Sequence, residues 1–162
     1  MQLAMLQNLV KAYYNEFATA YGFKDFPLLQ DVFAIITIES SWDPEAKSPA
    51  GAIGLMQITQ PALDQINMIY ATNFTMEDML RPDRNIWTGI RYLRWVYKTL
   101  SRFVNAHILA VLAYNWGIGN VLDWIAGKKS FSDIPKESKD YVLKYLYWRE
   151  YWEKKLRKEG KA

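Results

Sequence analysis

The stretch Val32-Phe33-Ala34-Ile35-Ile36-Thr37-Ile38-Glu39-Ser40 decides the fold of this chain. Its apolar run predicts a buried helix, which must end near Ser40 because Trp42-Asp43-Pro44 restricts the backbone that follows. Burial strips water from an ionised carboxylate and raises its pKa, and the C-terminal end of a helix disfavours the negative charge further. Glu39 is therefore expected to hold a proton near neutral pH, as a general acid must. From this helix alone, a structural ion pair with an Arg or Lys explains the acid equally well.

Helical periodicity continues on both sides of this run. We expect an N-terminal helix within residues 1–22, ending at Gly22, and a second helix that has Pro27 in its first turn and carries Glu39. Further helices are expected at 61–70, 82–100, 106–114, 121–126 and from Pro135 onward. The sequence thus predicts an all-α domain.

Residues 41–59 interrupt this helical pattern. They are rich in Pro, Gly, Ser and Ala and show no helical stripe, which predicts a long loop with a small β-hairpin in it. Loops of this length without regular structure tend to carry function.

Length and composition narrow the class of protein. A chain of 162 residues fits one domain, 1–162, with a sizeable core. The chain has no cysteine and a single histidine, His107, which argues against disulfides, a zinc site and a nucleophile acting through histidine. We therefore predict no cofactor and no metal. The net charge is +3, and the excess of basic residues lies in a tail at 151–162. Basic residues do not alternate with the aromatics along the chain, so nucleic acid is not a predicted partner.

The chain shows no targeting or membrane signal. The segment 1–8 lacks the basic and apolar regions of a signal peptide, and no apolar run approaches the roughly 20 residues that span a bilayer.

Three segments far from Glu39 in sequence could contribute to one site: Ser48–Gln57, Ala113–Gly117 and Ile134–Val142. Each also has an ordinary explanation. The first could be a plain glycine-rich loop, Tyr114 could be core, and Glu137 could complement a helix start.

Together these segments are specific. The combination of Glu39-Ser40, Ser48 to Gln57, Ala113-Tyr114-Asn115 and Pro135-x-Glu137-Ser138-x-x-Tyr141-Val142 resembles the catalytic domain of soluble lytic transglycosylases. The resemblance covers roughly residues 28–150 and implies the lysozyme-like fold that goose-type lysozymes share. Trp116 and Ile118 depart from the family pattern, which usually has Ala and Pro there, and Ser138 replaces a common Thr. These departures concern the shape of the sugar subsites.

The resemblance also implies roles for individual residues. Glu39 matches the single catalytic acid and base of the family, and Tyr114 matches the tyrosine whose hydroxyl points at that carboxyl group. The implied glycan-binding residues are Ser40, Ser48, Met56, Gln57, Asn115 and Tyr141.

Chemical reasoning agrees with a single acid. Standard glycosidases use two carboxyl groups, but Asp43 and Glu45 lie in a turn-rich segment where they fit as caps, and the other acids lie mostly on polar faces. The substrate must then supply the nucleophile. In peptidoglycan, the acetamido oxygen of N-acetylmuramic acid can stabilise the cationic sugar while its C6 hydroxyl attacks, with the entropic advantage of a tethered group.

The predicted function is therefore a monomeric peptidoglycan lytic transglycosylase. It would cleave the β-1,4 bond between N-acetylmuramic acid and N-acetylglucosamine and leave 1,6-anhydromuramic acid ends. Two alternatives stay open: a goose-type muramidase that adds water with the help of Asp43, and a non-catalytic peptidoglycan-binding or virion structural protein. The substrate lies in the periplasm or cell wall, so a chain without a signal peptide fits a phage endolysin, a virion-associated enzyme or an excised domain of an exported protein.

Overall fold

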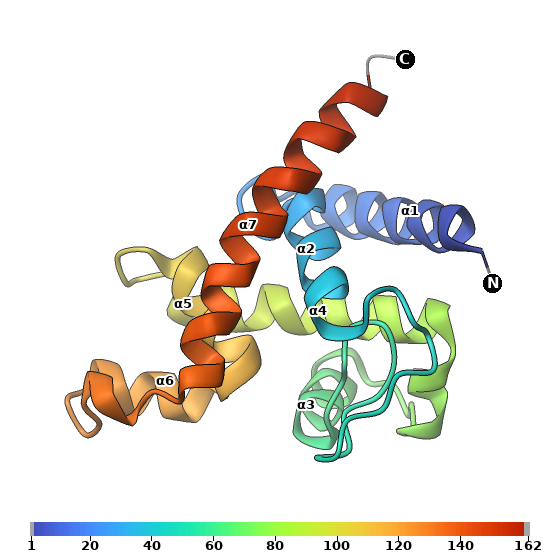
Figure 1. The fold of residues 1–162 in the computed structure, drawn as a ribbon. Coiled ribbons are helices and arrows are strands. Elements are labelled where there is room, and N and C mark those ends of the chain that lie inside the picture. Colours follow the sequence, from blue (N-terminus) through green and yellow to red (C-terminus); the bar gives the residue numbers. More distant parts are fainter. Residues whose placement is uncertain (1, 161–162) are drawn as a thin grey trace.

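The computed structural model describes residues 2–160, which form seven α-helices and two short 3-10 helices (Figure 1). In chain order the elements are α1 (Leu3–Tyr21), α2 (Leu29–Ser40), α3 (Gln60–Tyr70), η1 (Glu77–Leu80), α4 (Pro82–Leu100), α5 (Ala106–Trp116), α6 (Ile118–Ile125), η2 (Phe131–Asp133) and α7 (Lys136–Glu159). Within the described residues no strand forms, which confirms the all-α prediction. The hairpin expected in residues 41–59 is reduced to two isolated antiparallel bridges, Lys47–Ile53 and Ile53–Ile58.

Helix α2 is the centre of the core. Its residues from Val32 to Ile36 are at most 1% exposed. The helix begins after Leu28, whose N–H donates to the Asp31 carboxylate at 2.7 Å. Pro27, expected in the first turn, therefore precedes the helix. The predicted end is confirmed, because Ser41 adopts the left-handed conformation and donates its N–H to the Thr37 carbonyl.

Helix α7 crosses α2 and is fixed to it by polar contacts (Figure 1). The buried Asp31 carboxylate accepts the Tyr145 hydroxyl at 2.6 Å and the Arg149 Nε at 3.0 Å. Removing an isolated carboxylate from water costs too much free energy for it to be buried alone. Here a charged partner and donated hydrogen bonds offset the lost hydration. The same helix extends through Glu159, so most of the basic tail is helical, and residues 161–162 lie outside the described residues.

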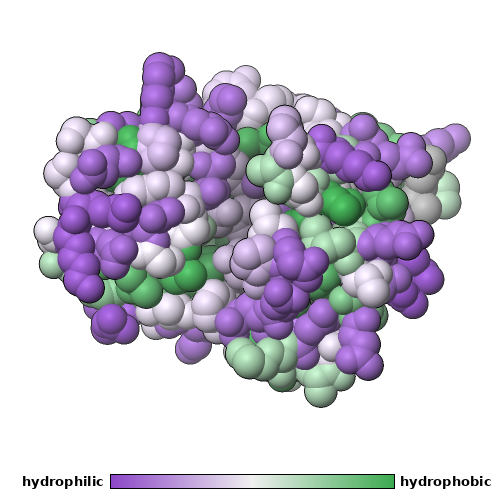
Figure 2. Space-filling view, turned by 90° about the horizontal axis from the view of Figure 1, so that it is seen from below, coloured by the Kyte–Doolittle hydropathy of each residue, from purple (hydrophilic) through white to green (hydrophobic). Residues whose placement is uncertain are grey.

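Two groups of elements, which we call the two halves, flank the C-terminal end of α2. In Figure 1 the loop 41–59 and α3 lie on one side of it, and α5 and α6 lie on the other. Figure 2 views the molecule from below and shows the surface hollowed between the two halves. Helix α4 has the predicted bounds, whereas α5 ends two residues later and α6 begins three residues earlier than the periodicity indicated.

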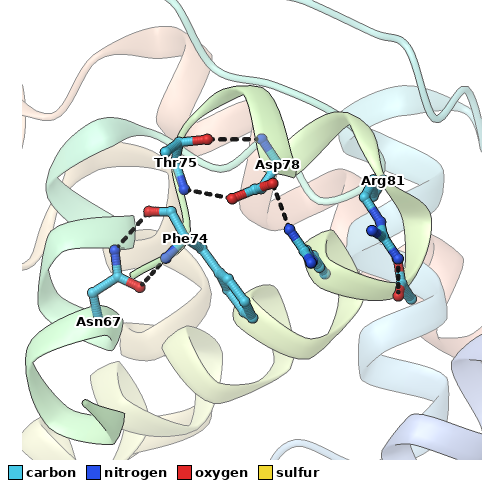
Figure 3. A network of polar contacts seen from close by, with 7 residues as sticks. Asn67, Phe74, Thr75, Asp78 and Arg81 are labelled. Atoms are coloured by element: carbon cyan, nitrogen blue, oxygen red, sulfur yellow. Dashed lines mark hydrogen bonds and ion pairs between the residues drawn. The ribbon is translucent and has the colours of Figure 1, made fainter. Parts of the chain in front are cut away.

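The connection from α3 to α4 is held by a polar network (Figure 3). The Asn67 side chain donates to the Phe74 carbonyl at 2.8 Å and accepts the Phe74 N–H at 3.2 Å. Asp78 accepts the Thr75 N–H at 2.8 Å and pairs with Arg84. These contacts fix η1, whose Met79 carbonyl lies against Gly54 of the loop 41–59.

Membrane crossing can be judged for the part of the chain that the structure describes. There, no helix combines the length and the apolar character that a bilayer span requires.

Candidate active site

Glu39 lies half-buried in the last turn of α2, between the two halves of the molecule. Its Oε2 accepts a hydrogen bond from the Tyr141 hydroxyl at 2.9 Å. Burial raises the pKa of Glu39 to about 7, the Tyr141 hydrogen bond opposes that rise, and the negative charge of Glu137 adds to it. A carboxyl group with this pKa keeps a proton on a large fraction of molecules at neutral pH, so it can act as a general acid.

Glu137 was missed as a site residue by the sequence analysis. It is exposed in the first turn of α7, where it suits the helix dipole, but its charge also acts on Glu39. Asp43 instead caps a turn, since its Oδ1 accepts the Glu45 N–H at 2.9 Å. Glu137 is the carboxylate whose negative charge adds to the raised pKa of Glu39. Its position in the Pro135-x-Glu137-Ser138 motif was the available signal.

Tyr114 and Tyr141 have different contacts from those that the resemblance implied. The Tyr114 hydroxyl donates to the Met56 carbonyl at 2.6 Å rather than to Glu39, and Tyr141 makes the contact with Glu39. Burial and the nearby Glu39 charge together raise the pKa of Tyr114 well above its usual value of 10. Tyr114 thus lies near the acid but acts on the loop.

Met56 enters the site through its backbone. Its side chain is 0% exposed and packs against Gly89, so it is not available to a sugar. Its carbonyl holds Tyr114, and its N–H donates to Asn85 Oδ1 at 2.9 Å.

Asn85 is the buried support of the loop. Besides accepting the Met56 N–H, its Nδ2 donates to the carbonyls of Ile53 and Met79, both at 2.9 Å. Gly54 packs so closely on Asn85 and on the Met79 carbonyl that a Cβ would collide with both, and its φ of 81° also favours glycine. The glycine-rich motif therefore serves a close backbone approach.

The two predicted serines also make internal contacts. Ser40 Oγ donates to the Leu55 carbonyl at 2.8 Å and so ties the end of α2 to the loop. Ser48 Oγ accepts the Ala52 N–H at 3.0 Å and stabilises a turn. In this structure both hydroxyls shape the site.

Gln57 is oriented toward a cavity. Its Nε2 donates to the carbonyls of Ala46 and Gly54, at 3.1 and 3.0 Å, which leaves the side-chain oxygen able to accept from a ligand. One cavity of about 350 Å³, which we call the Gln57 cavity, is lined by Gln57, Tyr114 and Asn115. Its other walls are Ile58, Thr59, Pro61, Ala62, Tyr92, Trp116, Gly117 and Ile118. Three predicted site residues therefore meet here, and the atypical Trp116 and Ile118 shape the same space.

The all-α fold, with a half-buried carboxyl group whose charge acts on Tyr114 in the cavity wall, defines the lysozyme-like class of domains. The chain belongs to the transglycosylase SLT domain family, whose model matches residues 25–136. The match overlaps the range 28–150 that the motifs indicated and ends where α7 begins.

Curated relatives and solved structures agree with this membership. The chain is 34% identical to the soluble lytic murein transglycosylase of Salmonella typhimurium over 149 residues, which cover 86% of this chain and 23% of that protein. It is 28% identical to the membrane-bound lytic murein transglycosylase F of Haemophilus influenzae, over 90% of this chain and 32% of the relative. The crystal structure of the 70 kDa soluble lytic transglycosylase of Escherichia coli matches with a TM-score of 0.73 and 31% identity, covering 92% of this chain and 24% of that one. The lysozyme-like fold is thereby confirmed, and the chain spans about a quarter to a third of the length of these proteins.

Proposed function

We propose that this domain is a peptidoglycan lytic transglycosylase. It would cleave the β-1,4 bond between N-acetylmuramic acid and N-acetylglucosamine and release 1,6-anhydromuramic acid ends. The observation that carries the proposal is the Glu39 carboxyl group in the last turn of α2, because burial raises its pKa to about 7. Relatives named as murein transglycosylases support the same chemistry.

The proposed reaction uses Glu39 twice. Protonated Glu39 gives its proton to the glycosidic oxygen, the bond to C1 of muramic acid breaks, and the neighbouring acetamido oxygen stabilises the cationic sugar. The C6 hydroxyl of the same sugar then attacks C1, and its proton returns to Glu39. No water is consumed, and the acid is restored. Tyr141 holds one oxygen of Glu39, which leaves the other to face the substrate.

The Gln57 cavity supplies groups suited to sugars. Gln57 offers an acceptor, and Asn115 adds an amide that both donates and accepts, as hydroxyl and acetamido groups require. Tyr92 and Trp116 provide aromatic surfaces on which sugar rings can pack.

A hydrolase is the second candidate, and one observation favours it. The charge of Glu137 raises the pKa of Glu39, so Glu137 is a carboxylate to test as the base for an attacking water. Glu137 thus joins Asp43 as a residue on which a muramidase would depend. In either case the substrate places the domain in the periplasm or cell wall, as a phage lysin, a virion component or a domain of an exported protein.

Product analysis tests the proposal. Purified peptidoglycan is digested in water enriched in ¹⁸O, and the fragments are examined by mass spectrometry before and after borohydride treatment. We expect unlabelled ends, one water lighter than hydrolysis products, that resist reduction. Labelled, reducible ends would identify a hydrolase. An absence of fragments, equal to that of Glu39→Gln, would identify a binding protein.

A further inference from the structure

A second cavity, of about 330 Å³, lies between α1, α3 and α4. We call it the α4 cavity, after the helix that supplies its three cations, Arg91, Arg94 and Lys98. It shares no residue with the Gln57 cavity, although Tyr92 of that cavity stacks on Trp95 of this one with the ring centroids 5.8 Å apart. Its walls include none of the residues proposed for catalysis. What it binds must therefore be argued from its own side chains.

The three cations share one face of α4. Arg91, Arg94 and Lys98 are three and four residues apart, so each lies about one turn after the last. Like charges at this spacing repel one another and destabilise a helix. Lys98 lies in the last turn, where it suits the helix dipole, but that effect does not extend to Arg91. A negative ligand in the cavity would offset the repulsion.

Arg91 is held in place by aromatic rings rather than by an acid. Its Cζ lies 3.9 Å from the centroid of the Trp87 ring and 4.5 Å from that of Phe17. Its Nη1 donates to the Trp87 carbonyl at 3.1 Å, whereas its Nε is buried without a hydrogen-bond partner. Burial lowers the pKa of Arg91, yet a guanidinium stays charged at neutral pH. The cavity thus contains a fixed cation with unused hydrogen-bonding capacity.

The protein balances only one of the three charges. Arg94 Nη1 donates to Asp25 Oδ1 at 2.7 Å. The ion pairs within residues 2–160 include neither Arg91 nor Lys98. The exposed Glu16 acts on Arg91 through its charge, without such a pair. Two cations of the α4 cavity are therefore left to an external anion.

Charge and size together indicate the class of anion. A carboxylate balances one cation, whereas a phosphate monoester carries a charge near −2 at neutral pH and balances both. The guanidinium fork also matches phosphate oxygens. The cavity is within the size range of small-molecule sites, so it holds more than a phosphate alone. Tyr21, Tyr70 and Trp95 give it an aromatic wall for an organic group, and Tyr21 is 59% exposed, so the wall is open to solvent.

We propose that the α4 cavity binds a ligand in which a dianionic phosphate group is attached to an organic body. The Arg91 guanidinium and the Lys98 ammonium would contact the phosphate oxygens, and the aromatic wall would pack against the organic part. Such a ligand would bind the domain without occupying the Gln57 cavity. The inference does not depend on the proposed function.

A titration tests the inference. Phenyl phosphate is titrated by calorimetry near pH 8, where its phosphate is doubly charged, into wild type, Arg91→Met and Lys98→Gln. We expect wild type to bind, Arg91→Met to weaken binding at least about tenfold, and Lys98→Gln to weaken it several-fold, on the scale of charged hydrogen bonds. Methionine keeps an unbranched stem between the rings, and Lys98 is exposed, so Lys98→Gln decides the test if Arg91→Met does not fold.

Two controls make the titration specific. Arg102→Gln removes an exposed cation just beyond α4 and outside the cavity, and it should leave the affinity unchanged. Benzoate has the same ring with a single charge, and it should bind wild type at least about tenfold more weakly than phenyl phosphate. Absence of phenyl phosphate binding, equal binding by wild type and the cavity variants, or equal affinity for benzoate would overturn the inference.

Vesicles distinguish two sources of the phosphate group. Wild type, Arg91→Met and Arg102→Gln are sedimented with phosphatidylcholine vesicles that contain or lack phosphatidic acid. Retention that requires phosphatidic acid, is lost in Arg91→Met and persists in Arg102→Gln would assign the site to a lipid headgroup. Binding of phenyl phosphate without retention on vesicles would assign it to a soluble organic phosphate. Either result supports the phosphate site.

Discussion

The Tyr141 hydroxyl donates to Glu39 Oε2 at 2.9 Å, and this contact ties the last helix of the chain to the proposed acid. One turn further along α7, Tyr145 makes the equivalent contact with Asp31 at the start of α2. Two tyrosines of α7 thus hold the two ends of one buried helix. The acid is positioned by a helix that begins about a hundred residues later in sequence, so it depends on the complete fold.

The first prediction concerns turnover. Glu39→Gln should remove cleavage of peptidoglycan by at least about 10²- to 10⁴-fold, the range of one general acid, because the amide has no proton to transfer. Binding to insoluble peptidoglycan should persist, since the side chain keeps its shape. Lysis assays and a pelleting assay measure the two effects. Lysis near the wild-type level would show that another group is the acid.

The second prediction concerns stability and pH. Burial raises the pKa of Glu39 from 4.5 to about 7, so the folded state holds this proton more tightly than the unfolded state. Below about pH 4.5 the group is protonated in both states and the fold keeps its full stability. Between pH 4.5 and 7 the unfolded state releases the proton first, so the stability falls, and it levels off above about pH 7, where both states are ionised. Glu39→Gln should therefore be more stable than wild type by about 1–3 kcal/mol near pH 8, with allowance for the half-buried position, and equally stable near pH 4. Urea unfolding at the two pH values measures the difference. An equal gain in stability for Glu39→Gln at both pH values would contradict the raised pKa of Glu39.

The third prediction concerns Tyr141. Its hydrogen bond stabilises the ionised form of Glu39, so Tyr141→Phe should raise the pKa of that carboxyl group further. In the pH profile of kcat/KM, the loss of activity on the alkaline side should shift to higher pH. A profile that only decreases in height would show that Tyr141 positions the acid without influencing its ionisation.

The fourth prediction concerns Tyr114. Tyr114→Phe leaves the Met56 carbonyl without its partner, which should destabilise the fold by about 1–3 kcal/mol. Loosening of the loop should also lower kcat about tenfold or more, since small displacements of positioning groups reduce rates strongly. Tyr92→Phe is the matched control, because Tyr92 lines the same cavity and its hydroxyl makes no hydrogen bond within residues 2–160. Equal thermal unfolding temperatures and rates for the two variants would assign Tyr114 to simple packing.

The sequence predicted the features that depend on local pattern. The apolar run before Glu39 indicated a buried helix and a perturbed acid, and the helix ends at Ser40 as Trp42-Asp43-Pro44 required. Helix α4 was predicted with its bounds, since Pro82 starts it and an amphipathic stripe defines its length. Hydrophobic periodicity and proline position influence the backbone only over a few neighbouring residues. A single sequence is therefore enough to predict the helices that depend on them.

The features that depend on distant packing could not be read in this way. The Tyr114 hydroxyl and the Tyr141 hydroxyl are equally plausible partners for Glu39 in sequence, and only the crossing of α7 over α2 decides between them. Met56 lies in a motif that resembles a ligand loop, but its side chain fills the space that Gly89 leaves on α4. A Glu in the first turn is favourable for a helix whatever the position of that helix in the fold. The effect of Glu137 on the pKa of Glu39 depends on where the fold places α7.

The last prediction separates the two enzymatic mechanisms at Glu137. Its negative charge adds to the raised pKa of Glu39, so Glu137→Gln should lower that pKa and shift the alkaline loss of kcat/KM to lower pH, opposite to Tyr141→Phe. In a transglycosylase the nucleophile is the C6 hydroxyl, so this variant should retain most of its activity at pH 5 and still yield anhydro ends. In a hydrolase Glu137 would activate the water, and activity should fall about 10²- to 10⁴-fold at every pH. Asp43→Asn is the control, because it removes a carboxylate from the neighbouring loop that caps a turn. A large loss at Glu137 together with labelled, reducible products would replace the transglycosylase mechanism with hydrolysis.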